Sequence, residues 1–132
     1  MKFMLDTNIC IYIIRNKPIK VRNKFATVEP KNVCISSITS SELWYGIHKS
    51  VNFEKNAIAL EKFLSPLTIL NYDERASKTY GDIRSKLECK GNVIGSMDLL
   101  IAAHAVSQNL TLITNNVREF KRVKGLNVEN WT

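Results

Sequence analysis

The sequence predicts an α/β protein of three layers, with helices on both faces of a mainly parallel central sheet. Short apolar segments of strand length alternate along the chain with longer segments of helical periodicity. Parallel strands need crossover connections, and the intervening helices supply them. The chain has 132 residues, of which 45% are hydrophobic and 23% charged, as in an average globular domain. We therefore expect residues 1–132 to form a single domain.

The N-terminal segments follow this alternation. Lys2–Leu5 is a strand candidate, and Thr7–Asn16 has the length and composition of a buried helix. A second short helix is expected to begin at Pro18, because proline suits the first turn of a helix. Glu29–Asn32 is rich in loop-forming residues, and Val33–Ser36 is the next strand.

The middle of the chain contains three predicted helices and one predicted strand. Thr39-Ser40-Ser41-Glu42 has the pattern of a capping box and predicts that a helix begins there. Phe53–Leu64 is helical until Pro66 ends it, and Leu67–Leu70 has the composition of a strand. Asp73–Cys89 is a long amphipathic helix whose first residue is its cap.

The C-terminal segments complete the pattern. Gly91-Asn92 predicts a turn, and Ser96–Gln108 a strongly apolar helix capped by its serine. Thr111–Thr114 follows as a strand, Asn115–Phe120 as a short helix, and Gly125–Trp131 as the last edge strand. The chain therefore alternates strand and helix to its end.

The formal charge of +7 favours an anionic partner. Nucleic acid is the first candidate and an acidic protein the second. Basic residues cluster in residues 15–24 and again in residues 121–124, which suits contacts to phosphates. The alternative for both clusters is a solvated surface, because lysine-rich surfaces are common.

Other compartments and classes of protein fit the sequence less well. No apolar run approaches the roughly 18 residues needed to span a membrane, and the N-terminus lacks the features of a signal peptide. The three cysteines, Cys10, Cys34 and Cys89, show no Cys-x-x-Cys spacing, which favours reduced structural thiols. We therefore expect a cytoplasmic protein without a membrane partner.

Acidic side chains stand where predicted strands pass into helices. Asp6 follows the first strand, Glu42 lies in the first turn after the second, and Asp98 begins the helix that leads to the last central strand. In such sheets, binding sites gather at the carboxyl ends of strands. Carboxylates and water are ligands that Mg²⁺ and Mn²⁺ prefer, and a bound metal can polarise a phosphate and activate water. The three acids are therefore candidate metal ligands.

Each acid also has a structural explanation. Asp6 can be an N-cap, Glu42 the third residue of a capping box, and Asp98 a first-turn acid that complements the helix dipole. Asp73 shows the difficulty, because it also follows a strand and begins a helix. Position alone does not separate the two interpretations.

Four motifs in order resemble the VapC-type toxins of the PIN-domain family, and the resemblance covers nearly the whole chain. The motifs are Met4-Leu5-Asp6-Thr7-Asn8, Ser41-Glu42-Leu43 with Gly46, residues 94–105, and residues 114–120. The ending, Gly125-Leu126 through Glu129-Asn130-Trp131, is similar to the enteric-type VapC subgroup. The expected fold is accordingly a three-layer PIN-like domain.

The resemblance implies a set of site residues. Asp6, Glu42 and Asp98 would bind Mg²⁺ or Mn²⁺, and Asn8 and Thr114 would support them by hydrogen bonds. Many family members also place an aspartate two positions after the threonine.

This chain has Asn116 at that fourth position. Asn116 offers a carbonyl oxygen, and Glu119, about one helical turn further, offers a charge. Both stay open as catalytic residues.

The resemblance further implies a metal-dependent endoribonuclease that hydrolyses RNA, with tRNA, and above all the initiator tRNA anticodon stem-loop, as the leading substrate. It implies inhibition by a VapB-type antitoxin, a toxin homodimer, operator DNA contacted only through the antitoxin, and a place in the bacterial cytoplasm. The surface around Trp44, Tyr45 and Phe53 is the candidate antitoxin groove.

Three other functions remain in view. The chain can be a DNA nuclease or a non-catalytic nucleic-acid-binding PIN module. A receiver-like phosphoryl acceptor would need a second acid near the first strand, and none occurs between Asp6 and Glu29.

Overall fold

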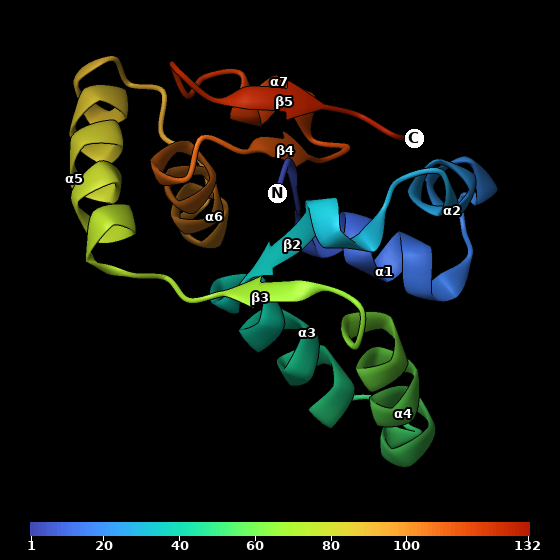
Figure 1. The fold of residues 1–132 in the computed structure, drawn as a ribbon. Coiled ribbons are helices and arrows are strands. Elements are labelled where there is room, and N and C mark those ends of the chain that lie inside the picture. The colour runs from blue at the N-terminus through green and yellow to red at the C-terminus, as the bar shows by residue number, and fades with distance from the viewer.

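A five-stranded sheet lies between two groups of helices in the computed structural model, which describes all 132 residues (Figure 1). The strand order is β3-β2-β1-β4-β5, and every neighbouring pair is parallel. The strands are β1 (Phe3–Leu5), β2 (Val33–Ser36), β3 (Thr68–Leu70), β4 (Thr111–Ile113) and β5 (Asn127–Glu129). The predicted parallel sheet is confirmed, including the last segment as an edge strand.

Seven α-helices connect the strands. They are α1 (Thr7–Arg15), α2 (Ile19–Ala26), α3 (Ser37–His48), α4 (Phe53–Leu64), α5 (Glu74–Cys89), α6 (Ser96–Ser107) and α7 (Val117–Phe120). A single 3₁₀ turn, Pro30–Asn32, stands where a loop was expected. None of these helices combines the length and the apolar character that crossing a membrane would require.

Each face of the sheet has its own apolar core, because successive strand residues point to opposite faces. Met4, Cys34 and Leu112 pack with residues of α5 and α6 in one cluster. Leu5, Ile35 and Ile113 pack with residues of α1, α2, α3 and α4 in the other. Figure 1 shows α5 and α6 on one side of the sheet and α1, α2 and α4 on the other. The three-layer prediction is confirmed.

Two predicted helix starts are correct. Asp6 caps α1 by accepting a hydrogen bond from the Ile9 amide at 2.9 Å. Asp73 caps α5 by accepting one from the Ala76 amide at 3.0 Å. Both caps satisfy amides of the first turn that have no partner within the helix.

Two other predicted starts are wrong. Helix α3 begins at Ser37 rather than at a capping box around Glu42, because the hydroxyl of Ser36 accepts the Ile38 amide directly at the end of β2. Helix α6 has Gly95 at its N-cap, with no side-chain cap, and Ser96 is already its first helical residue. Glu42 therefore lies in the second turn of its helix, whereas Asp98 does lie in the first turn.

Several buried polar and sulfur side chains behave as the sequence suggested. The cysteines are all free thiols, and Cys10 and Cys34 are fully buried. His104 is also fully buried, and its Nδ1 lies 2.8 Å from the hydroxyl oxygen of Ser36. The prediction of a hydrogen-bonded packing histidine is thus confirmed.

Candidate active site

Asp6 directly follows β1, next to the end of β4, and is the residue before α1. Its backbone amide donates to the Ile113 carbonyl at 3.0 Å, which ties the end of β1 to the end of β4. Its side chain is only 4% exposed. The capping interpretation of Asp6 is therefore correct, but one cap does not explain why a carboxylate rather than a serine is buried here.

Thr114 directly follows β4 and is fully buried beside Asp6. Its Oγ1 accepts the Asn116 amide at 2.9 Å, which leaves the hydroxyl proton free to be donated. The Thr114 side chain lowers the pKa of Asp6, as does the Ile9 amide, although burial outweighs both. Thr114 thus supports the ionised form of Asp6.

Glu42 reaches the same region from α3. The Thr7 hydroxyl donates to its Oε1 at 2.6 Å, across 35 residues of sequence. No role for Thr7 beyond its place in the first motif can be predicted from the sequence, because the partner of its hydroxyl depends on how α1 and α3 pack.

Burial and mutual repulsion act on the acids together. The pKa of Asp6 is raised to about 6, mainly by burial and to a smaller extent by the nearby charges of Asp98 and Glu42. Burial likewise raises the pKa of Asp98, followed by the charges of Glu119 and Glu42. The structure therefore brings four carboxylates, from the end of β1 and from α3, α6 and α7, within electrostatic range of one another.

No lysine or arginine neutralises these four acids. The ion pairs of the chain are Lys31–Glu29, Arg84–Glu88 and Lys86–Asp82, all at the surface. Unpaired buried carboxylates are costly, and in a protein of net charge +7 cationic side chains are plentiful. A cluster of acids without such a partner is the donor set that a hard divalent cation prefers.

The carboxylates do not yet converge on one point. No group of three acidic, histidine or cysteine side chains is close enough together to hold a metal ion as the structure stands. Repulsion between like charges favours this spread arrangement, and the hydrogen bond from Thr7 holds Glu42. The donor chemistry fits Mg²⁺ or Mn²⁺, and binding requires side-chain movement toward the ion.

The remaining predicted site residues differ in their surroundings. Asn8 lies in the first turn of α1, is exposed, and makes no side-chain hydrogen bond. Asn116 is the residue before α7, and its backbone groups are bonded, to Thr114 and Phe120, whereas its side chain makes no hydrogen bond. Glu119, in contrast, raises the pKa of Asp98 through its charge. Of the two candidates for the fourth position, Glu119 is the one in electrostatic contact with the acids.

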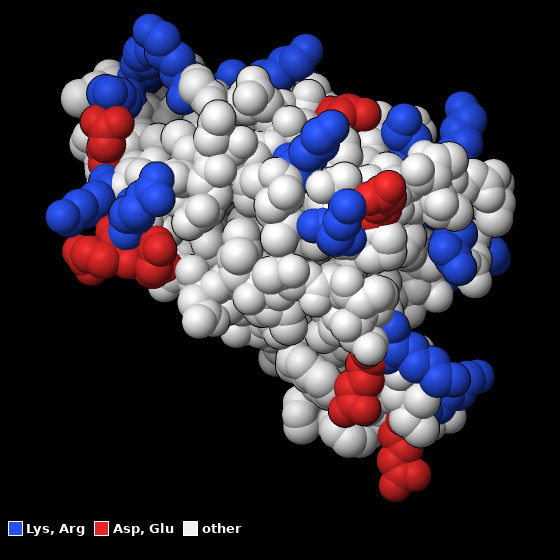
Figure 2. All heavy atoms as spheres, viewed as in Figure 1, with Lys and Arg blue, Asp and Glu red and all other residues white.

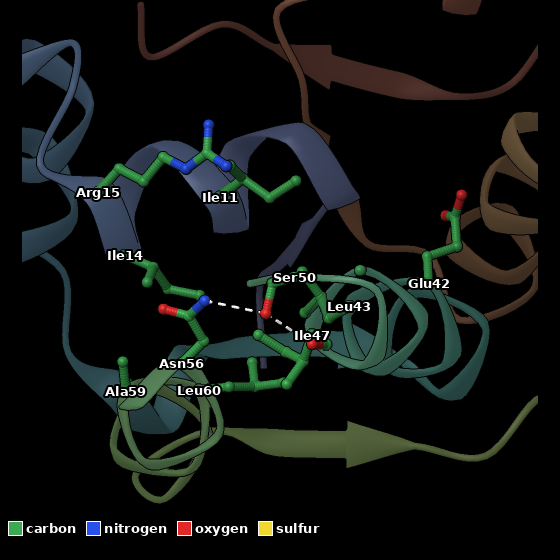
Figure 3. Close-up of a pocket in the computed structure, with 11 residues that line it drawn as sticks. Ile11, Ile14, Arg15, Glu42, Leu43, Ile47, Ser50, Asn56, Ala59 and Leu60 are labelled. Carbon is green, nitrogen blue, oxygen red and sulfur yellow. Dashed lines mark hydrogen bonds between the residues drawn. The ribbon is translucent and has the colours of Figure 1, made fainter. Parts of the chain in front are cut away.

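An apolar groove adjoins the acids between α1, α3 and α4 (Figure 3). Its apolar walls are Ile11, Ile14, Leu43, Ile47 and Leu60. Figure 3 shows Arg15 and Glu42 at opposite ends of the lining, with the Asn56 amide bonded to the Ser50 hydroxyl at 3.0 Å.

The residues expected to line an antitoxin groove lie elsewhere. Trp44, Tyr45 and Phe53 are absent from the lining of this groove, and Tyr45 is 66% exposed. This groove is lined instead in part by residues of α1, whose apolar spacing in the sequence does not distinguish a groove wall from the core.

Comparison with known proteins gives a consistent result. Residues 3–126 match the model of the PIN domain. The chain is 47% identical to the tRNA(fMet)-specific endonuclease VapC of Salmonella typhimurium, over 99% of this chain and 98% of that protein. It is 48% identical to the Shigella flexneri protein of the same name, over 100% and 99%.

The fold agrees with solved structures as well. The crystal structure of VapBC2 from Rickettsia felis bound to a DNA fragment from their promoter contains a chain that superimposes with a TM-score of 0.94. That chain is 44% identical, and the match covers 100% of both chains. A parallel sheet carrying unpaired acids at its edge, the PIN-domain match and full-length relatives of this identity lead to one conclusion: the chain belongs to the VapC ribonucleases of the PIN-domain family.

Proposed function

We propose that the chain is a Mg²⁺- or Mn²⁺-dependent endoribonuclease whose metal is held by Asp6, Glu42 and Asp98. The observation that carries this proposal is the group of mutually repelling acids without any lysine or arginine partner. Glu119 completes the acidic site in place of Asn116, because its charge acts on Asp98. Thr114 lowers the pKa of Asp6, against the larger effect of burial, and the Thr7 hydroxyl holds the Glu42 carboxylate by a hydrogen bond.

A divalent cation bound here would polarise an RNA phosphate and lower the pKa of an attacking water. The chain's own residues position it: Asp6 is held by the Ile9 amide, and Glu42 by the Thr7 hydroxyl. Asn8, exposed beside Asp6 in the sequence, is free to contact the substrate or the metal-bound water shell.

The substrate we propose is tRNA, with initiator tRNA as the first candidate. Two full-length relatives carry the name tRNA(fMet)-specific endonuclease. The net charge of +7 suits a polyanionic substrate. We further propose that the enzyme acts in the bacterial cytoplasm as a homodimer.

A VapB-type antitoxin is the proposed inhibitor, by analogy with the VapBC2 complex of Rickettsia felis. The apolar groove of Ile11, Ile14, Leu43, Ile47 and Leu60 is better suited to hold it than the surface around Trp44, because it leads to Glu42. Operator DNA would then be bound through the antitoxin.

The decisive experiment is expression of this chain alone in a sensitive host, with mapping of newly formed RNA 5′ ends. Purified protein is then incubated with initiator tRNA and Mg²⁺ or EDTA. Cleavage at a defined tRNA position that disappears in EDTA and in Asp98→Asn supports the proposal. Cleavage retained by a folded Asp98→Asn protein, or cleavage of DNA in place of RNA, contradicts it.

A further inference from the structure

A basic groove lies between the C-terminal half of α5 and the segment that follows α7. It has a volume of about 250 Å³ and its polar lining consists of Lys86, Lys90, Arg122, Lys124 and one acid, Asp82. Its floor is apolar and belongs to the core, with Ile83, Leu87 and Val123 each less than a tenth exposed. Four cations therefore face one carboxylate in a single depression.

Most of this positive charge is free. Lys86 pairs with Asp82 at 3.1 Å, one turn apart on α5. Neither Lys90 nor Lys124 forms an ion pair or a side-chain hydrogen bond. Figure 2 shows lysine and arginine side chains gathered where the end of α5 meets the segment after α7. A depression of this kind attracts anions more strongly than scattered surface charges do.

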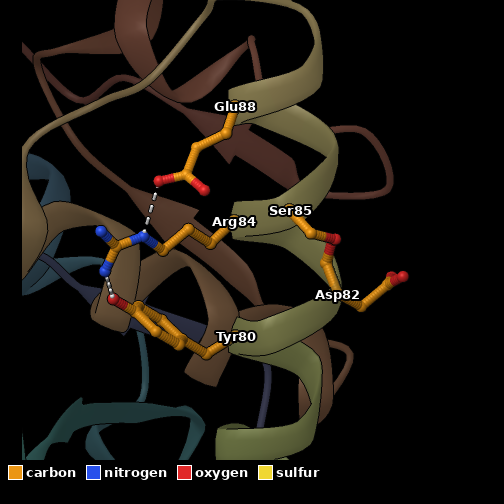
Figure 4. A network of polar contacts seen from close by, with 5 residues as sticks. All are labelled: Tyr80, Asp82, Arg84, Ser85 and Glu88. Atoms are coloured by element: carbon orange, nitrogen blue, oxygen red, sulfur yellow. Dashed lines mark hydrogen bonds and ion pairs between the residues drawn. The ribbon is translucent and has the colours of Figure 1, made fainter.

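On the other side of α5, the charge of Arg84 is neutralised by an acid of the same helix. Arg84 donates to Glu88 at 3.1 Å and to the Tyr80 hydroxyl at 2.7 Å. Figure 4 shows this contact on one side of the helix and Asp82 pointing to the other. Residues 82, 86 and 90, four apart, share one face of the helix. Lys86 and Lys90 thus line the groove, and Lys90, directly after the end of α5, has no ion-pair partner.

The groove is connected to the acidic site through two segments. Arg122 donates through Nη1 to the carbonyl of Val93 at 3.2 Å, in the segment that leads to Asp98. The Arg122 amide also donates to the carbonyl of Glu119 at 3.1 Å, one turn earlier. Arg122 is therefore tied to the two segments that carry Asp98 and Glu119, and its guanidinium keeps further donors for an anion.

We propose that this groove binds the phosphate backbone of the RNA strand on one side of the scissile bond. The inference rests on the proposed ribonuclease function and adds a substrate-positioning surface to it. The four carboxylates repel the phosphates of an RNA strand. The cations of the groove attract phosphates and so offset this repulsion. Phosphate contacts of this kind fix the register of the strand without reading its sequence.

The test uses the double variant Lys90→Gln/Lys124→Gln, since both side chains are exposed and unbonded. The matched control, Lys55→Gln/Lys62→Gln, removes the same charge from exposed positions on α4. Binding of labelled initiator tRNA is measured at several salt concentrations in the Asp98→Asn background, and cleavage is measured in the active background.

The groove variant is expected to bind RNA on the order of tenfold more weakly than the control, and its logarithmic salt dependence is expected to fall by roughly 1 to 1.5. Equal losses in both variants, or none in the groove variant, overturn the proposal. Unchanged RNA binding with weakened binding of the purified antitoxin assigns the groove to an acidic protein and also overturns it.

The outcome separates this inference from the proposed function. If the parent protein cleaves RNA and the groove variant does so equally at all salt concentrations, only the groove assignment fails. If the parent neither binds nor cleaves RNA, the ribonuclease proposal fails and the groove assignment fails with it.

Discussion

The hydroxyl of Thr7 lies 2.6 Å from Oε1 of Glu42 and joins the first turn of α1 to the second turn of α3. These residues are 35 positions apart, and Glu42 also lines the apolar groove between α1, α3 and α4. A hydrogen bond to a charged group is worth about 1.5 to 3 kcal/mol. Thr7 therefore holds one of the proposed metal ligands in place.

Replacing Thr7 with valine tests this relationship. Thr7→Val keeps the side-chain volume but removes the donor, so we expect the rate of tRNA cleavage to fall about tenfold while the fold is retained. Single-turnover cleavage and thermal unfolding measure the two effects. Thr7→Ser restores the donor and should recover most of the rate; a serine variant as slow as the valine variant would contradict the role.

The raised pKa of Asp6 makes stability depend on pH. Its pKa rises from the ordinary value of 3.8 to about 6 in the fold, mainly through burial. Between these two pH values the folded state keeps a proton on Asp6 that the unfolded state has released. Without metal, this group therefore costs stability above pH 6, and the cost disappears as the pH falls to about 4.

Asp6→Asn isolates that contribution. Asparagine caps a helix about as well as aspartate but carries no charge, so at pH 7.5 in EDTA the variant should exceed the parent in free energy of unfolding by about 2 kcal/mol. The difference should shrink toward zero near pH 4. Urea unfolding at both pH values measures this difference. Because variant and parent are compared at the same pH, the contribution of His104, present in both proteins, cancels. A difference independent of pH would be inconsistent with the burial effect.

Metal binding should act in the opposite direction. Mg²⁺ or Mn²⁺ neutralises the repelling acids, so saturating metal should raise the melting temperature of the parent by several degrees at pH 7.5. Asp6→Asn and Asp98→Asn should show a much smaller rise. At pH 5 the effect on the parent should also shrink, because Asp6 with its pKa of about 6 is then largely protonated. An equal rise in all three proteins would indicate binding elsewhere.

The fourth acidic position can be assigned by two single substitutions. Glu119→Gln removes a charge that acts on Asp98, and we expect metal affinity to fall about tenfold, as read from Mn²⁺ titrations. Asn116→Ala removes a side chain that makes no hydrogen bond, and we expect little change. A larger loss from Asn116→Ala than from Glu119→Gln would reverse the assignment.

Ser36 contributes to the stability of the fold. Its hydroxyl oxygen caps α3 and contacts Nδ1 of buried His104, so Ser36→Ala should lower the free energy of unfolding by about 2 to 3 kcal/mol. The matched control is Ser41→Ala, an exposed position on the same helix whose hydroxyl bonds only to the Ser37 carbonyl. We expect that control to stay within about 0.5 kcal/mol of the parent in urea unfolding.

The sequence by itself determined the alternation of strands and helices and the caps made by Asp6 and Asp73. Those features depend on hydrogen bonds and apolar spacing within a few residues, which a local pattern encodes. Helix α3 shows where local patterns are ambiguous. Several serine and threonine residues compete there as caps, and the end of β2 decides for Ser36.

The tertiary structure alone decided which distant side chains meet. The Thr7 bond to Glu42, the charge of Glu119 acting on Asp98, and the groove shared by Lys90 and Arg122 all join residues from different elements. Such pairs depend on the angle and distance at which helices pack on the sheet, and the packing of many residues sets both. The acids could therefore be predicted from the sequence. Only the fold shows that they lie close enough to repel one another and that no lysine or arginine pairs with them.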